Sequence, residues 1–378
     1  MPGAAEVWTA LPRARIVGGA VRDLLAARPV EDVDFAVPAP PPEIIRLLAA
    51  AGIRAVPTGI AHGTVTAVAA GRGFEITSLR RDVETDGRRA LVAFTDDWEA
   101  DAARRDFTIN AMSMTQDGAL HDYFGGADDL RIGRVRFVGE AMRRIKEDYL
   151  RILRFFRFFA RYGKGDPDPE ALAAITALRD GLRGLSAERV GSELKRILAA
   201  PDPRPAVALM ARTGVLPLIF TEGADVAALD RLVAQGAPPE PLLRIAALLR
   251  GDPGRFAERL RLSGEEQALL RLYRAPNGLL PGAGGAALRR ALADEPAPVL
   301  LARSWLAGDA GPGWRELRAR LAATPRPVFP LRGRDILALG VPAGPDVGRR
   351  LEAVRNWWRQ DGCTANFERC LAQARRMK

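Results

Sequence analysis

The spacing of apolar residues changes along the chain, and this change limits the folds that the chain can adopt. Up to about residue 110, stretches such as "HGTVTAVAA", "GRGFEITSL" and "LVAF" alternate apolar and polar residues, as strands with one buried face do. From about residue 140 onward, Ala, Leu and Arg recur at helical spacing, as in "VGSELKRILAA" and "LEAVRNWWRQ". The pattern predicts an α+β chain in which a mixed sheet comes first and an all-helical part follows.

A glycine pair stands where the first strand is expected to turn into a helix. In "RIVGGAVRDLL" the strand would end at Val17 and the helix would begin near Ala20. Gly18 and Gly19 lie between them, and free N–H groups at such a turn can bind a phosphate that approaches closely. Arg22, in the first helical turn, would add a charged donor. Without further motifs, a glycine pair is more often a simple turn.

Two aspartates one residue apart follow this turn. In "EDVDFAV" apolar residues alternate with Asp32 and Asp34, so on a strand both carboxylates would leave the face opposite the core. Glu75 in "GRGFEITSL" has the same setting, and a neighbouring strand would present it to the same place. Because one or two carboxylates plus substrate phosphates commonly hold Mg²⁺, the sequence predicts a magnesium site at Asp32 and Asp34. The alternative is a polar strand edge without a ligand.

Another polar set lies in "EDYLRILRFFRFFARY". On a helix that starts at Glu147, one face would collect the polar side chains of Asp148, Arg151, Arg154, Arg157 and Arg161. Such a stripe is usually only solvated. However, Asp148 can accept from the amino group of cytosine or adenine while Arg151 donates to the ring acceptors, whereas uracil and guanine place a carbonyl opposite the carboxylate.

The basic excess of the chain lies in its second half. Residues 201–378 contain 27 Lys and Arg against 18 Asp and Glu, whereas residues 1–200 contain 29 against 28. This asymmetry indicates a polyanionic partner for the second half, although a general preference for arginine would give the same balance. No run of about 18 apolar residues and no apolar leader occur, so we expect a cytoplasmic protein without a membrane partner.

Five segments, in order, resemble the motifs of one family of the polymerase-beta nucleotidyltransferase superfamily, the bacterial-type tRNA CCA-adding enzymes and poly(A) polymerases. They are "IVGGAVRDLLAARPVEDVDFAV", "ARRDFTINAMS", "HDYFGGADDLRIGRVRFVG", "EDYLRILRFFRFFARY" and "LSAERVGSELKRIL". The resemblance implies that Asp32 and Asp34 bind metal and that Glu75 lies beside them. It also implies nucleotide contacts from a second set of residues: Gly19, Arg22, Arg105, Asp106, Asn110, Asp148, Arg151 and Arg154.

The resemblance also implies a division of the chain and a reaction. We expect a nucleotidyltransferase head with a mixed sheet over residues 1–138, a helical neck that reads the base over 139–200, and a helical body and tail that bind tRNA over 201–378. The implied reaction is Mg²⁺-dependent, template-independent addition of CCA to tRNA 3′ ends from CTP and ATP, with release of pyrophosphate.

Three other functions stay open at this point. A poly(A) polymerase of the same family is one, although "PTGIAHGTVTAV" resembles the CCA-adding strand. A partial enzyme that adds only CC or only A is the second, although the polar loop expected over residues 78–103 resembles a flexible segment of complete CCA-adding enzymes. A non-catalytic RNA-binding protein is the third, and it would be expected to have lost an aspartate of the D-x-D pair.

Overall fold

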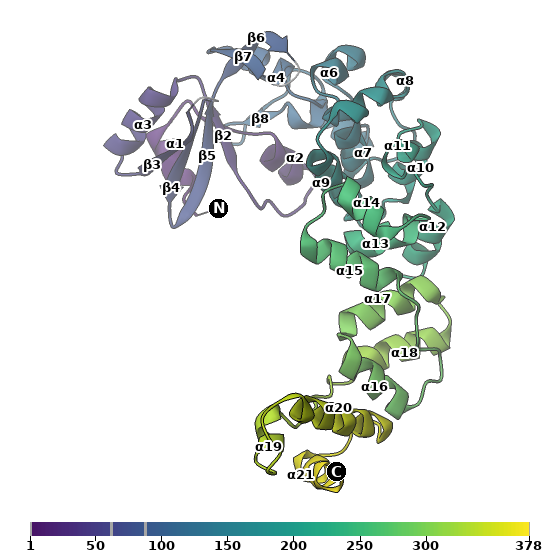
Figure 1. The fold of residues 1–378 in the computed structure, drawn as a ribbon. Helices are drawn as coiled ribbons and strands as arrows, with labels where there is room; N and C mark the ends of the chain where they lie inside the picture. The colour runs from purple at the N-terminus through teal and green to yellow at the C-terminus, as the bar shows by residue number, and fades with distance from the viewer. Residues whose placement is uncertain (1, 61–62, 87–88, 378) are drawn as a thin grey trace. The chain divides into compact units, whose positions relative to one another are not determined.

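The computed structural model describes residues 2–60, 63–86 and 89–377 (Figure 1). It divides into two compact units, Met1–Thr221 and Glu222–Lys378. Among the described residues, no helix combines the length and the apolar character needed to cross a lipid bilayer.

A seven-stranded sheet lies at the beginning of the first unit, with strand order β3-β4-β5-β2-β1-β8-β9. Its strands are β1 (Arg15–Val17), β2 (Asp34–Val37), β3 (Arg54–Gly59), β4 (Thr64–Ala69), β5 (Arg72–Ser78), β8 (Ser113–Met114) and β9 (Leu120–His121). β2 and β5 pair in parallel and the other neighbours are antiparallel. The prediction of an initial mixed sheet is therefore confirmed.

The register of β2 brings the expected acidic residues together. Asp34 opens the strand opposite Val17 of β1, and the pairing of Phe35 with Ile76 sets Glu75 beside the start of β2. Asp32, however, precedes the strand, so the expectation that both aspartates lie on it was wrong for Asp32. Strict alternation is also lost because β2 is a central strand: Ala36 packs with Val17 on one face, while Phe35 contacts the ring of Phe74 on the other.

The segment expected to be a polar loop forms a two-stranded ribbon instead. β6 (Arg80–Asp86) pairs with β7 (Arg89–Phe94) in antiparallel register, and residues 87–88 lie outside the described part. The loop prediction over residues 78–103 was therefore wrong for β6 and for residues 98–103, which form a helix, whereas the strand predicted at "LVAF" is confirmed by β7.

Short helices surround the sheet and continue after it. The described α-helices of the first unit are α1 (Ala4–Ala10), α2 (Gly19–Leu25), α3 (Pro41–Ala50), α4 (Trp98–Ala103), α5 (Gly126–Ile132), α6 (Ala141–Glu147), α7 (Leu150–Tyr162), α8 (Pro169–Leu178), α9 (Ala187–Leu198), α10 (Arg204–Arg212) and α11 (Leu216–Ile219). Two short 3₁₀ helices, η2 (Thr108–Asn110) and η3 (Arg179–Gly184), also belong to this unit. Helix α7 packs against α9 and α10, and its apolar face buries Phe155 and Phe156 completely, with the Phe155 ring beside those of Phe107 and Phe137. The arginines of α7 lie on its polar face, where Arg157 pairs with Glu193 of α9.

The second unit is helical in its described residues. Its helices are α12 (Val226–Ala234), α13 (Pro241–Leu248), α14 (Pro253–Arg259), α15 (Gly264–Arg274), α16 (Gly285–Asp294), α17 (Ala297–Ala307), α18 (Pro312–Ala323), α19 (Gly333–Leu337), α20 (Pro345–Gln360) and α21 (Phe367–Arg376). Leu288, Leu300 and Leu317 join α16, α17 and α18 in one core, and Trp358 belongs to a second core around α20 and α21. The prediction of an all-helical remainder is confirmed.

Candidate functional site

A pocket of about 480 Å³ in the first unit collects most of the predicted site residues. Its lining includes Gly18, Gly19, Arg22, Asp34, Arg105, Asp106, Asn110, Asp148, Arg151, Arg154, Arg157 and Arg189. Six of these are arginines and three are aspartates, so the lining carries an excess of positive charge. Such a lining suits a polyanionic ligand. Asp32 and Glu75 are not among the lining residues.

The turn between β1 and α2 forms one wall of the pocket. Gly18 has φ 65° and precedes α2, which begins at Gly19, one residue before the predicted start. A Cβ added to Gly18 would lie 3.0 Å from Nη1 of Arg105, while Gly19 has room for one. The turn therefore requires glycine at the first position for its backbone conformation.

Arg22 is fixed by three other residues. Its Nη1 donates to Oδ1 of Asn110 at 2.6 Å, and its Nε and Nη2 donate to the two carboxylate oxygens of Asp23 at 3.2 and 2.9 Å. The hydroxyl of Tyr162 donates to Oδ1 of the same aspartate, and the Tyr162 ring lies 4.6 Å from the guanidinium. The side chain is thus held ready at the turn instead of being free in solution.

Asp34 lies in a negatively charged part of the site. Its pKa is raised because the surrounding protein removes hydration and because Glu75 and Asp32 repel its charge, while Arg105 acts in the opposite direction. Within the described residues, no group of three or more Asp, Glu, His or Cys side chains is arranged to hold a metal ion. A cation here would therefore need ligands from a bound substrate in addition to the carboxylates.

Asp106 links the second predicted motif to α7. Its Oδ1 accepts from Nδ2 of Asn110 at 3.0 Å, and its Oδ2 accepts from Nε of Arg154 at 2.6 Å. Burial by itself would raise the pKa of Asp106, but the charge of Arg154 and these hydrogen bonds hold the pKa below its usual value. Asp106 therefore positions Asn110 and Arg154 and is itself 8% exposed.

The helix expected from Glu147 begins later than predicted. α6 ends at Glu147, α7 begins at Leu150, and Asp148 lies between them with an extended backbone. The prediction was wrong here because the chain turns between the two helices at Asp148, whose Oδ1 accepts from the N–H of Leu150 at 3.0 Å across this turn. Its carboxylate still faces the pocket together with Arg151.

Pairing partners of these residues were missed at the sequence level. Arg189 of α9 donates to Oδ2 of Asp148 at 2.8 Å, and Arg151 donates to Glu147 at 2.5 Å. Arg157 also lines the pocket and pairs with buried Glu193 at 2.7 Å. Arg189 and Glu193 both occur in "LSAERVGSELKRIL", so the resemblance of that segment to a family motif was the available signal.

The first unit matches a known catalytic domain. Residues 14–136 match the family model described as the poly A polymerase head domain, and residues 166–226 match that of the probable RNA and SrmB-binding site of polymerase A. Together with the turn and the acidic strand start, this match places the chain in the class of nucleotidyltransferases.

Relatives that align over most of this chain show which nucleotidyltransferase family it belongs to. Human mitochondrial CCA tRNA nucleotidyltransferase 1 is 38% identical over 363 residues, which cover 92% of this chain and 83% of that protein. The CCA-adding enzyme of Geobacillus stearothermophilus is 33% identical over 379 residues, with 92% and 88% covered. The crystal structure of Bacillus stearothermophilus CCA-adding enzyme in complex with CTP has a TM-score of 0.75 and 28% identity, with 95% and 92% covered. The chain belongs to the family of CCA tRNA nucleotidyltransferases and poly(A) polymerases.

Proposed function

We propose that this protein adds C, C and A to the 3′ end of tRNA, taking the nucleotides from CTP and ATP and releasing pyrophosphate. The observation that carries the proposal is that one pocket combines a glycine turn, six arginines, an acidic strand start and the pair Asp148 and Arg151. The names of the relatives, which align over 92% of the chain, support the same activity.

The triphosphate would lie against the turn at Gly18 and Gly19. Arg22 and Arg105 line this end of the pocket, and their donors suit phosphate oxygens. Arg22 is already oriented by Asp23 and Asn110, so little side-chain freedom is lost when a phosphate binds. Arg154, held by Asp106, would contact the sugar or the phosphates from α7.

A divalent cation would be held by Asp32 and Asp34, with Glu75 beside them. The donor set fits such an ion, because Glu75 and Asp32 repel the charge of Asp34 and a bound cation would offset that repulsion. Enzymes of this family generally use a divalent metal, and we propose Mg²⁺. When bound, Mg²⁺ would lower the pKa of the primer 3′-hydroxyl and neutralise phosphate charge.

The base would be read by protein side chains. Each carboxylate oxygen of Asp148 already accepts one hydrogen bond, and each retains a second acceptor position for the amino group of cytosine or adenine. Arg151 would donate to the ring acceptors after it leaves Glu147. The carbonyl oxygen of uracil or guanine would instead face the carboxylate of Asp148, and these two acceptors would repel each other.

The experiment that tests the function uses tRNA lacking its 3′ end. The protein is incubated with this tRNA and with each nucleotide alone, then with CTP and ATP together, and the ends are sequenced. Complete CCA ends that appear only with both nucleotides support the proposal. Long A tails indicate a poly(A) polymerase, ends at CC or at A alone indicate a partial enzyme, and unchanged ends with retained tRNA binding indicate a non-catalytic RNA-binding protein.

The proposal also assigns a role to each segment of the chain and a cellular location to the protein. The head would cover residues 1–138 and the neck 139–200, and residues 201–378 would hold the tRNA backbone with their basic excess. We place the protein in the cytoplasm, and fractionation of cells that express it with an antibody as probe would test this.

A further inference from the structure

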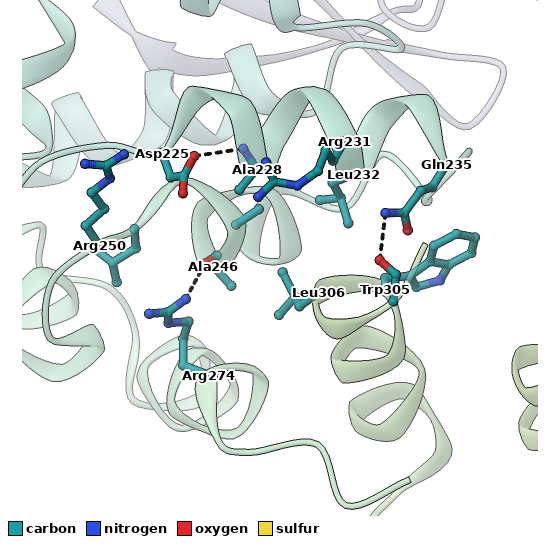
Figure 2. Close-up of a pocket in the computed structure, with 13 residues that line it drawn as sticks. Asp225, Ala228, Arg231, Leu232, Gln235, Ala246, Arg250, Arg274, Trp305 and Leu306 are labelled. Atoms are coloured by element: carbon teal, nitrogen blue, oxygen red, sulfur yellow. Dashed lines mark hydrogen bonds between the residues drawn. The ribbon is translucent and has the colours of Figure 1, made fainter. Parts of the chain in front are cut away.

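A second pocket lies entirely within the second unit, between α12, α13, α15 and α17. Its volume is about 380 Å³, which is within the range of small-molecule sites. Figure 2 shows Arg250, Arg231 and Arg274 around one end and Leu306 and Trp305 toward the other. The two ends therefore differ in chemistry.

The arginine end carries more positive than negative charge. Within the described part of the chain, Arg231, Arg250 and Arg274 make no ion pair, and Arg274 donates only to the carbonyl oxygen of Ala246, at 3.3 Å. The lining contains a single carboxylate, Asp225, and its Oδ1 caps α12 by accepting from Ala228 N at 2.9 Å. Three guanidinium groups against this one carboxylate, which lies at the same end of the pocket (Figure 2), leave an excess of positive charge that a bound anion would neutralise.

The other end is apolar and held in place. Arg318 lies 3.6 Å over the ring of Trp305 and donates to the carbonyl of Ser304 at 2.9 Å, so the indole is fixed from one side. Gln235 of α12 donates to the carbonyl of Gly308 at 2.9 Å, which ties this end to the neighbouring helix (Figure 2). A rigid aromatic and aliphatic wall favours a flat, apolar group on the ligand.

We propose that this pocket binds a nucleotide, with its phosphate at the three arginines and its base against Trp305 and Leu306. A single phosphate would contact only the arginine end, whereas a nucleotide uses both ends of the pocket. The nucleotide is either free in solution or part of an RNA strand, since both present the same chemistry. The site is separate from the pocket of the first unit and does not depend on the reaction proposed there.

The first arm of the test measures free nucleotide binding to the full-length protein. Equilibrium dialysis with ATP should detect one site fewer per chain in the double variant Arg231→Ala/Arg274→Ala than in wild type. Loss of two charged donors should weaken the second site at least about tenfold. Arg271→Ala is the matched control. Arg271 lies on α15, as Arg274 does, and is exposed, but it does not line the pocket. Inorganic phosphate should compete at the second site.

The second arm measures tRNA binding to the same proteins over a range of salt concentrations. If wild type and the double variant bind the same number of ATP molecules and the double variant binds tRNA more weakly with a lower salt slope, the occupant is a nucleotide of the RNA. If the two proteins bind the same number of ATP molecules and the double variant matches wild type and Arg271→Ala in tRNA affinity and salt slope, the proposal is overturned. Neither arm requires catalysis, so failure of the proposed function would leave this test intact.

Discussion

The carboxylate of Asp148 is paired with Arg189: Nη2 of the arginine lies 2.8 Å from Oδ2 of the aspartate, and the pair joins the segment before α7 to α9. Both side chains line the pocket, 35% and 30% exposed for Arg189 and Asp148, so the pair is reachable by a ligand. Arg189 therefore orients the group that we assign to base reading without covering it.

Replacement of Asp148 should reduce discrimination between bases from both sides. Asp148→Ala removes the acceptor for the amino group of C or A and the repulsion of the carbonyl of U or G, with a loss for CTP and ATP of about 1 to 3 kcal/mol. The check is kcat/KM for all four nucleotides, with Arg161→Ala as control, because Arg161 is an exposed residue of α7 that does not line the pocket. An equal loss for every nucleotide would move base reading elsewhere.

Replacement of Asp34 should abolish nucleotide addition without weakening the fold. The raised pKa of Asp34 means that its ionised form destabilises the folded state at pH values above that pKa, so Asp34→Asn should keep or raise the melting temperature at pH 7. Added Mg²⁺ should stabilise wild type and have less effect on the variant. Thermal unfolding with and without MgCl₂ checks both points, and near-normal turnover of Asp34→Asn or of Asp32→Ala would contradict the assignment.

The two glycines of the turn should respond differently to alanine. Gly18→Ala should destabilise the protein by about 1 to 2 kcal/mol, because φ of 65° is unfavourable for alanine and the new Cβ meets Arg105. Gly19→Ala has room and should leave stability nearly unchanged, but it should raise KM for nucleotides if phosphate contacts the backbone there. Urea unfolding and nucleotide kinetics separate these effects. Equal stability of the two variants would argue against a strained turn.

Loss of Arg154 should destabilise the protein in a pH-dependent way. In wild type the lowered pKa of Asp106 means that its carboxylate stabilises the fold above about pH 4, and this contribution is lost as the pH falls through the folded-state pKa. In Arg154→Ala burial is opposed only by the hydrogen bonds from Asn110 and Phe107, so the pKa of Asp106 rises and the buried ion costs about 3 kcal/mol at pH 7. Urea unfolding at pH 7 and pH 5 should show the larger difference at pH 7, whereas Arg131→Ala, which breaks an exposed pair, should be neutral at both.

Removal of the second unit should weaken tRNA binding. A boundary near residue 200 would cut away α10, which packs against α7, so the shortened protein should end after Thr221, where the first compact unit ends. If the basic excess holds the RNA backbone, this protein should lose affinity, and the affinity of the full chain should fall steeply with salt. Circular dichroism confirms that the shortened protein is folded. Equal affinity of both proteins, without salt dependence, would place RNA binding in the first unit.

The sequence alone predicted a structural element correctly where a short local pattern determines that element. The strand ending at Val17 and the acidic start of β2 followed from alternation and from glycine chemistry. The start of α7 could not be predicted in this way. Asp148 fits a helical stripe, yet it lies in the turn between α6 and α7 and accepts a hydrogen bond from Leu150 that residue spacing does not reveal. The pairing with Arg189 joins residues 41 positions apart, and only tertiary packing of α9 brings them together.

One helix touches both ends of the proposed nucleotide site. Arg151 and Arg154 stand near the start of α7, and Tyr162, its last residue, holds Asp23, which in turn holds Arg22 at the glycine turn. The 13 residues of α7 span about 20 Å, so this rigid helix sets the distance between the residues that read the base and those that bind the phosphates. A change of one turn in this helix would shift one end by about 5 Å and would change the size of ligand that the site accepts, even with every contacting side chain kept.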